Sequence, residues 1–305
     1  MIDSINRAFL GPTTIIAHDA GAAFYLAKIV KRVKDHSQIF LVLDGPARTI
    51  FNKEFSMKEM DRFRGCNKVW NPILEDSQLV ITGSGWSSNL EIDAIERAKE
   101  LGKTSFCLLD HWVNFRRRQT RENHLTLPDE FWVVDEVALK NAREEFNQER
   151  VKIRQIDDPV ISDLKMLEMK VREKKQLLYV TEPIANFGLM NHLISDSLVT
   201  EEQVFAEFAK AVKKHAWQGQ IFVRVHPSEK KEMYQEFIKK FSLDAEVSRQ
   251  PNPLLEILSS EIIVGIESVM LAWAAKIGKK TFTMLPINNR FCSLPNFGIE
   301  SFCND

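Results

Sequence analysis

The sequence predicts an α/β protein of two doubly wound, Rossmann-like domains that face each other across a cleft. Short, continuously apolar strands alternate with amphipathic helices along the whole chain. The alternation stops near the middle and then restarts, and 305 residues are enough for two domains of ordinary size. Uninterrupted apolar strands that alternate with helices are typical of a parallel sheet covered on both faces.

The first half of the chain predicts one complete domain, over residues 1–160. Its strands are expected at residues 13–17, 38–43, 79–82, 104–109, 131–134 and 151–154. Helices are expected over 20–33 and 88–101, with another between the last two strands.

The second half restarts the pattern after Ile156-Asp157-Asp158-Pro159 and a charged helix that runs to about residue 174. The boundary is expected within residues 160–175, and the second domain over 161–305. Its strands are expected at residues 176–180, 221–225, 261–264 and 281–285, and its helices at 201–216, 229–241, 253–259 and 268–277.

Composition excludes several classes of protein. Lys and Arg total 41 against 42 Asp and Glu, which argues against a general nucleic-acid-binding protein. Four scattered cysteines, Cys66, Cys107, Cys292 and Cys303, form no CxxC pair, so we expect no zinc ribbon and a cytoplasmic chain with reduced thiols. No apolar run is long enough to span a membrane, and no signal peptide is expected. Metal-binding motifs are also missing, so no metal or other cofactor is expected.

The strongest candidate site follows the strand that ends in Arg224-Val225. Ligands of open α/β sheets bind beyond the carboxyl ends of the strands. There His226, with Pro227 fixing the turn, can present a ring nitrogen to a phosphate, and the next helix adds backbone donors. The alternative is a plain strand-to-helix turn with Ser228 as the helix cap.

A second candidate follows the strand at 261–264. Gly265 lets the backbone approach a ligand, Ser268 can bind a phosphate at a helix N-terminus, and Glu267 can accept ribose hydroxyls. The alternative is an ordinary turn with a serine cap. Together with Arg224, His226 and Pro227, these residues indicate a nucleotide site. A Walker motif and a GxGxxG motif are both missing, so an ATPase or a dehydrogenase is not expected.

Carboxylates and small polar residues follow the strands of the first half. Asp19, Asp44 and Asp110 each follow a strand, and one of them could act as general base, with His111 beside Asp110. The alternative for each aspartate is a turn or cap residue. Hydroxyl, aromatic and imidazole groups suited to binding a sugar stand at His18, Ser84, Trp86 and Trp112.

The densest basic cluster is Arg116-Arg117-Arg118, with Lys103 and Arg121 near it in the sequence. It could attract an anionic acceptor or a lipid headgroup, which would place the chain peripherally at the inner face of a membrane. The alternative is a solvated loop.

The second half resembles the donor-binding half of GT-B glycosyltransferases. The resemblance rests on Leu177 to Pro183, on Val223-Arg224-Val225-His226-Pro227 and on Gly265-Ile266-Glu267-Ser268, and it covers about residues 130–286. It is closest to the bacterial sialyltransferase, polysialyltransferase and capsule-type group, whose members carry an HP motif and a Ser/Thr motif at these places.

This resemblance implies a metal-independent transferase that uses a nucleotide-activated sugar. His226 would contact the phosphate of a CMP-linked donor, and Ser268, with Glu267 beside it, would bind the same phosphate. The base of that group lies in an acidic-acidic-Gly motif, which Leu43-Asp44-Gly45 and Leu109-Asp110-His111 match only in part.

The resulting hypothesis is a cytoplasmic transferase of bacterial surface-polysaccharide assembly. It would move a sugar, of the sialic-acid or Kdo type if the donor is CMP-linked, onto a glycan or glycoconjugate acceptor. Three alternatives stay open: a nucleotide-sugar epimerase or hydrolase of the same fold, a non-catalytic nucleotide-sugar-binding protein, and an adaptor that binds membranes or nucleic acid through Arg116 to Arg118.

Overall fold

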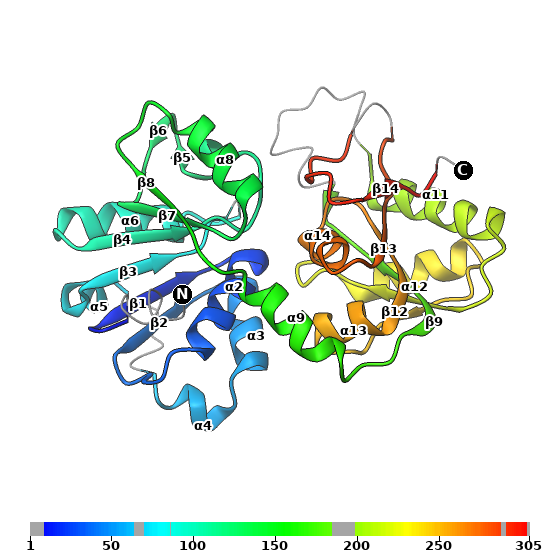
Figure 1. Cartoon of the computed structure of the whole chain (residues 1–305), viewed down its shortest axis with the longest axis horizontal. Coiled ribbons are helices and arrows are strands. Elements are labelled where there is room, and N and C mark those ends of the chain that lie inside the picture. The colour runs from blue at the N-terminus through cyan, green and yellow to red at the C-terminus, as the bar shows by residue number, and fades with distance from the viewer. Residues whose placement is uncertain (1–8, 64–69, 86, 185–198, 288–290, 304–305) are drawn as a thin grey trace. The chain divides into compact units, whose positions relative to one another are not determined.

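A computed structural model describes residues 9–63, 70–85, 87–184, 199–287 and 291–303. The chain divides into two compact units, Met1–Val160 (unit 1) and Ile161–Asp305 (unit 2). Each unit is built around a parallel six-stranded sheet with helices packed on it (Figure 1). The predicted α/β class is therefore confirmed.

The sheet of unit 1 has the order β2-β1-β3-β4-β7-β8, and every neighbouring pair is parallel. Strand β1 lies between β2 and β3, so the crossover to β2 runs to one side of β1 and the crossover to β3 runs to the other. The topological switch point of the sheet therefore lies at the carboxyl end of β1. Strands β1 and β3 are fully buried, and their residues are apolar apart from threonines. The strands are β1 (Thr13–Ala17), β2 (Ile39–Leu43), β3 (Leu79–Thr82), β4 (Thr104–Leu108), β7 (Glu130–Val133) and β8 (Lys152–Gln155).

The longer helices of unit 1 are α2 (Ala20–Lys31), α3 (Gly45–Glu54), α6 (Leu90–Glu100) and α8 (Glu136–Glu145). Helix α3 was not predicted because it buries only Ala47 and Phe51, too few apolar side chains for a helical period to be visible. The short elements were not predicted either: α4 (Met57–Met60), α5 (Asn71–Asp76), α7 (Phe115–Arg118) and the hairpin of β5 (Thr120–Arg121) and β6 (His124–Leu125).

The sheet of unit 2 has the order β11-β10-β9-β12-β13-β14, again wholly parallel. Strand β9 lies between β10 and β12, so the switch point of this sheet lies at the end of β9. The order is that of a dinucleotide-binding Rossmann sheet. The strands are β9 (Lys174–Val180), β10 (Gln220–Arg224), β11 (Glu246–Val247), β12 (Ser260–Gly265), β13 (Lys280–Thr283) and β14 (Glu300–Ser301).

Unit 2 has an aromatic core. Tyr179 of β9 stacks on Phe208, with ring centroids 4.2 Å apart, and meets Phe205 edge-on. Both phenylalanines belong to the apolar face of α11, where buried residues recur at helical spacing. The helices are α9 (Pro159–Glu168), which begins at the end of unit 1, α11 (Glu201–Lys214), α12 (Lys231–Lys240), α13 (Pro253–Ser259) and α14 (Val269–Lys276).

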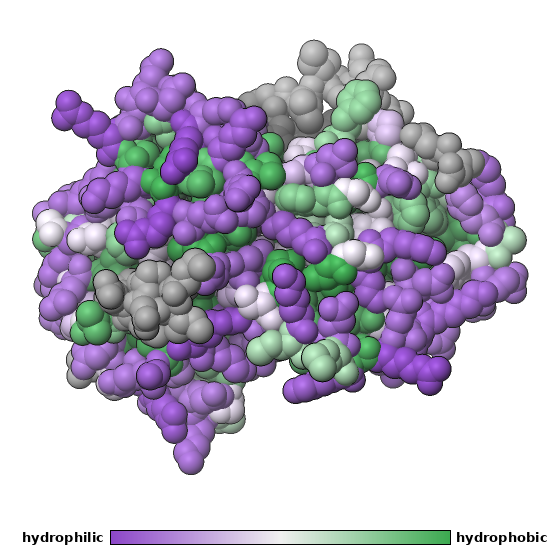
Figure 2. Space-filling view, in the orientation of Figure 1, coloured by the Kyte–Doolittle hydropathy of each residue, from purple (hydrophilic) through white to green (hydrophobic). Residues whose placement is uncertain are grey.

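The face of the molecule in Figure 2 is mostly hydrophilic, with apolar side chains in small groups between polar ones. Large apolar side chains that are exposed are few among the described residues: Leu10, Met57, Met166, Met169 and Phe291. None of the helices in the described part of the chain has the length and apolar character needed to cross a bilayer.

Candidate functional site

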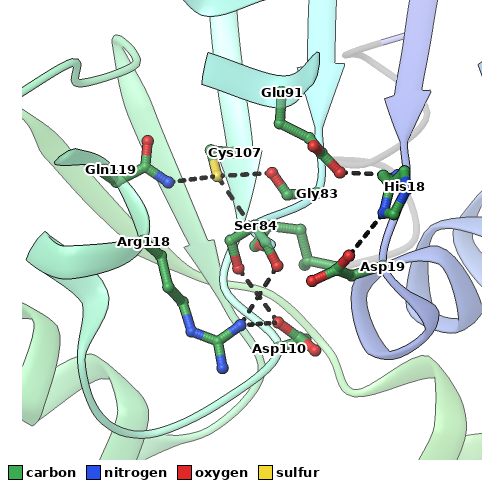
Figure 3. Close-up of polar contacts among 10 residues, drawn as sticks. His18, Asp19, Gly83, Ser84, Glu91, Cys107, Asp110, Arg118 and Gln119 are labelled. Carbon is green, nitrogen blue, oxygen red and sulfur yellow. Dashed lines mark hydrogen bonds and ion pairs between the residues drawn. The ribbon is translucent and has the colours of Figure 1, made fainter. Parts of the chain in front are cut away.

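A cluster of polar side chains lies at the carboxyl ends of β1, β3 and β4 in unit 1 (Figure 3). These ends flank the switch point of the sheet, where ligands of open α/β sheets bind. The cluster, called here the unit 1 acidic cluster, consists of His18, Asp19, Ser84, Glu91, Asp110 and Arg118.

Asp110 is the most enclosed aspartate of the unit 1 acidic cluster, with 8% of the residue exposed. Its Oδ1 accepts from the Ser84 hydroxyl at 3.1 Å and pairs with Nη1 of Arg118 at 3.4 Å. Burial raises the pKa of Asp110, and the nearby Arg118 charge opposes that rise. A Cβ on Gly21 would lie 2.0 Å from Oδ2, so the carboxylate sits against the first turn of α2 and only glycine fits there.

His18 and Asp19 form a hydrogen-bonded pair beside Asp110. The distance from His18 Nδ1 to Asp19 Oδ1 is 2.7 Å, and both side chains keep some exposure, at 17% and 18%. Two glycines leave room for them, since a Cβ on Gly85 would lie 2.8 Å from the Asp19 carboxylate and a Cβ on Gly45 would lie 2.5 Å from His18 Nε2. A carboxylate that orients an imidazole is an arrangement suited to general acid–base chemistry.

Glu91, in the first turn of α6, is 3% exposed. Its Oε1 accepts the backbone N–H of His18 at 2.7 Å. Its Oε2 is buried and has no hydrogen-bond partner among the described residues. Burial, helped by the negative charge of Asp19, raises the pKa of Glu91 to about 7. This carboxyl group is therefore able to exchange a proton near neutral pH.

The raised pKa of Glu91 predicts a pH-dependent stability that Glu91→Gln abolishes. The folded state binds this proton more tightly than the unfolded state, so the contribution is present below pH 4.5 and is lost as the pH rises through 7. A shift from 4.5 to about 7 corresponds to about 3 kcal/mol. Between pH 4.5 and 8, the free energy of unfolding of wild type should fall by about this amount relative to Glu91→Gln.

Urea unfolding of both proteins at several pH values measures this difference. Glu100→Gln is the matched control, because Glu100 lies on the same helix with 64% of its side chain exposed. A pH-independent difference between wild type and Glu91→Gln would contradict the prediction.

The remaining predicted residues of unit 1 lie outside the acidic cluster. Asp44 is exposed, and its carboxylate forms an ion pair with Arg48 of α3 at 3.2 Å. Trp112 is only 1% exposed and donates its indole N–H to Asp135, so it is a core residue and cannot present a ring face to a sugar. His111 is half-buried with its ring against that of Trp112, and its catalytic role stays a prediction. Trp86 lies outside the described residues.

Ser84 and two arginines of the basic cluster have polar partners within unit 1. Ser84 is 1% exposed and its hydroxyl is bound to Asp110, so it orients that carboxylate instead of touching a sugar. Arg116 and Arg118 are used within unit 1, because Arg116 pairs with Glu149 and Arg118 with Asp110. These two guanidinium groups pair with carboxylates of the chain itself, and Arg117 between them is exposed, so the lipid-binding patch at residues 116–118 stays a prediction.

In unit 2, two residues that follow β9 connect the two predicted phosphate loops. The hydroxyl of Thr181 accepts the backbone N–H of His226 at 2.8 Å, on the β10 side. The carboxylate of Glu182 accepts the backbone N–H of Glu267 at 2.9 Å, on the β12 side. Neighbouring strands lie about 4.8 Å apart, so the loops after β10 and β12 start about 10 Å apart across β9.

His226 and Ser268 lie on the loops after β10 and β12, and their binding of a phosphate stays a prediction. His226 is half-exposed, and its Nδ1 lies 2.7 Å from the Ser228 hydroxyl. Pro227 is exposed at the start of the turn, and α12 begins only at Lys231, so no helix terminus follows His226 directly. Ser268 is the N-cap of α14 and accepts from the Met270 N–H at 3.4 Å, and Glu267 accepts from the Ser293 N–H at 2.7 Å.

Two residues predicted for the nucleotide have structural roles instead. The guanidinium of Arg224 pairs with the buried Glu256 at 2.5 Å and donates to the carbonyl of Gln250, which leaves it turned toward α13. Gly265 lies at the end of β12, where a Cβ would meet the Val180 carbonyl at 3.0 Å. Close packing between strands, not access for a ligand, explains this glycine.

Several residues of both sites were not predicted. Thr181 and Glu182 directly follow β9. The rule that ligands bind beyond the carboxyl ends of strands, called here the strand-end rule, could therefore have found them. Glu91 resembles the acidic residues common in a first helical turn, and Arg118 was hidden within a basic run. Among the residues that the structure describes, no group of three or more His, Cys, Asp or Glu side chains is arranged to hold a metal ion.

The fold was compared with those of known proteins. No protein-family model matches the chain, and no curated protein sequence matches it. Solved structures do match. The UDP-GlcNAc 2-epimerase of Neisseria meningitidis bound to UDP-GlcNAc is 11% identical with a TM-score of 0.61, covering 94% of this chain and 86% of the epimerase. The chain has a GT-B-like fold.

Two further structures have the same fold. The complex of MnaA with UDP from S. aureus is 12% identical with a TM-score of 0.60, covering 90% of this chain and 79% of MnaA. The wall teichoic acid polymerase TagF is 8% identical with a TM-score of 0.50, covering 93% of this chain and 71% of that one. Identities this low establish the fold only, because one fold hosts many functions.

Proposed function

We propose that the chain is an enzyme of the glycosyltransferase type, which moves a sugar from a nucleotide to a glycan or glycoconjugate acceptor without a metal. The observation that carries the proposal is the hydrogen-bonded connection of the His226 and Ser268 loops through Thr181 and Glu182. It ties the loops that carry both residues to the end of β9, at the switch point of the sheet, and ligands of open α/β sheets bind at such points.

The role of unit 2 in this proposal is to hold the phosphate of the nucleotide. Ser268 accepts the Met270 N–H through its oxygen, so its own hydroxyl proton can be donated to a phosphate oxygen. The N-terminus of α14 adds a favourable electrostatic field for an anion. Donors of this kind, fixed in place before the reaction, stabilise the negative charge that develops on the departing nucleotide.

The role of unit 1 is to supply acid–base groups. Asp19 and His18 keep the exposure that a substrate needs, whereas Asp110 is enclosed by Ser84 and Arg118. We therefore place the general base, which would take the proton of an acceptor hydroxyl, at the Asp19–His18 pair. Asp110 and Glu91 would tune the proton affinity of the Asp19–His18 pair through their charges.

A nucleotide-sugar epimerase is the second candidate. It is supported by the similarity to the N. meningitidis UDP-GlcNAc 2-epimerase along 94% of the chain. An epimerase needs no acceptor, so conversion of a nucleotide sugar by the protein alone would favour it over a transferase. The neighbours are described with UDP or UDP-GlcNAc, whereas the resemblance to sialyltransferase-type enzymes implies a CMP-linked donor, so both nucleotides must be tested.

A thermal-shift screen with CMP, CDP, UDP, GDP and dTDP tests nucleotide binding. A ligand present at about 100 times its Kd stabilises the native state by about 2.7 kcal/mol. We expect one nucleotide to raise the Tm by about 5 °C or more, and to do so equally in EDTA. No stabilisation by any of the five would overturn the proposed function. Product analysis with the matching nucleotide sugar, with and without acceptor glycans, then separates the transferase from the epimerase.

A further inference from the structure

The His226 ring is held by two groups of the same residue, Ser228. The backbone N–H of Ser228 points at Nδ1 of His226, with the two nitrogens 3.2 Å apart, and the Ser228 hydroxyl oxygen lies 2.7 Å from the same Nδ1. A backbone N–H can only donate. This contact therefore favours Nδ1 as the acceptor, and a neutral imidazole that accepts at Nδ1 carries its proton on Nε2.

The Ser228 hydroxyl can act as a second donor to Nδ1. With Nδ1 unprotonated, the hydroxyl can donate to it together with the backbone N–H. With Nδ1 protonated, the hydroxyl could only accept, and the ring N–H would also point at the backbone N–H of Ser228, which disfavours the other neutral tautomer. Ser228 is itself exposed, so it holds the ring without packing in the core.

The backbone of His226 is fixed by a second set of contacts. The Thr181 hydroxyl has one proton, which it donates to Glu229 Oε2 at 2.5 Å, so it accepts from the His226 N–H. Glu229 Oε1 in turn accepts the Tyr234 hydroxyl at 2.7 Å. Thr181 and Tyr234 are buried, at 1% and 2% exposed. This chain of hydrogen bonds anchors the His226 turn to β9 and α12.

We infer that Ser228 is a positioning residue, which holds His226 as the Nε2–H tautomer so that the ring presents a neutral N–H donor to an anionic oxygen. The inference rests on the proposed function for the identity of that oxygen, a phosphate of the nucleotide. A ring fixed in this tautomer cannot accept a proton at Nε2, so at this position it is a hydrogen-bond donor and not a base.

The tautomer is measured by ¹⁵N NMR of the histidine-labelled full chain without ligand, with His226→Gln used to assign the signals. We expect the His226 signals of wild type to show protonated Nε2 and unprotonated Nδ1. Ser228→Ala removes one of the two donors and should give a mixture of tautomers, and Ser228→Thr should restore the wild-type signals. Ser248→Ala is the control, because Ser248 is a serine of the same unit whose hydroxyl accepts from the Gln250 N–H, where that of Ser228 contacts His226.

A wild-type His226 protonated at Nδ1, or a Ser228→Ala spectrum identical to wild type, would overturn the inference whatever nucleotides do. Binding of UDP and CMP, followed by calorimetry, gives the second readout, in which Ser228→Ala should weaken the Kd about threefold to tenfold while Ser248→Ala does not. An Nε2–H tautomer in a protein that none of the five nucleotides of the thermal-shift screen stabilises would leave the inference intact and overturn the proposed function instead.

Discussion

Replacing His226 by alanine is expected to weaken nucleotide binding at least tenfold and to lower turnover of the nucleotide sugar at least tenfold. The ring would donate one hydrogen bond to a charged oxygen, and such a bond contributes about 1.5–3 kcal/mol. One factor of ten corresponds to about 1.4 kcal/mol. Since the stabilised charge grows as the nucleotide departs, the loss in turnover should equal or exceed the loss in binding.

The measurement combines calorimetric titration with the nucleotide that stabilises the protein and an assay of nucleotide release. The fold should be unaffected, because His226 is half-exposed and its backbone contact to Thr181 does not need the ring. His215→Ala is the control, since His215 is an exposed histidine of the same unit. Unchanged binding and turnover in His226→Ala would remove the central residue of the proposed site.

Replacing Arg118 by methionine is expected to destabilise the chain by about 3 kcal/mol at neutral pH. The side chains of Arg118 and Asp110 are 9% and 10% exposed, and removing one partner of a buried pair leaves the other charge uncompensated. Arg118 opposes the rise in the pKa of Asp110, so its loss raises that pKa further. A carboxyl with a raised folded-state pKa destabilises the protein once it ionises, and the deficit should therefore grow from pH 5 to pH 8.

Urea unfolding of single and double variants tests the predicted loss of stability in Arg118→Met. Asp110→Asn combined with Arg118→Met should recover most of the loss, because the double variant leaves no buried charge behind. Arg116→Met is the control. Its side chain is 41% exposed where it pairs with Glu149, so its removal should cost less than about 1 kcal/mol. An equal cost for Arg116→Met and Arg118→Met would show that burial does not strengthen the dependence on Arg118.

The regular part of the fold could be predicted because its signals are local. Strands β1 and β3 were expected at residues 13–17 and 79–82, the bounds they have, since a buried parallel strand is a continuous apolar run with polar residues on either side. Helix α13 likewise has the expected bounds, 253–259, with Asn252 and Pro253 marking its start. The weak elements, such as α4 and the β5–β6 hairpin, carry too few buried side chains to leave a pattern.

The candidate sites could be predicted only as a set of strand ends. The strand-end rule found Asp19, Asp110, His226 and Ser268, but it could not separate them from Asp44 and Trp112, which also follow strands. Exposure and partners made that distinction, through the surface pair of Asp44 with Arg48 and the burial of Trp112.

From the sequence alone came the α/β class, the regular strands and helices, and the turn that carries His226. The tertiary structure alone decided which turns meet, as with Glu182 and Glu267, 85 residues apart, or His18 and Glu91, 73 apart. The physical reason is the range of the forces involved. Hydrophobic periodicity is written into a few consecutive residues, whereas a hydrogen bond or a shifted pKa depends on whichever side chains the order of strands brings within a few ångströms.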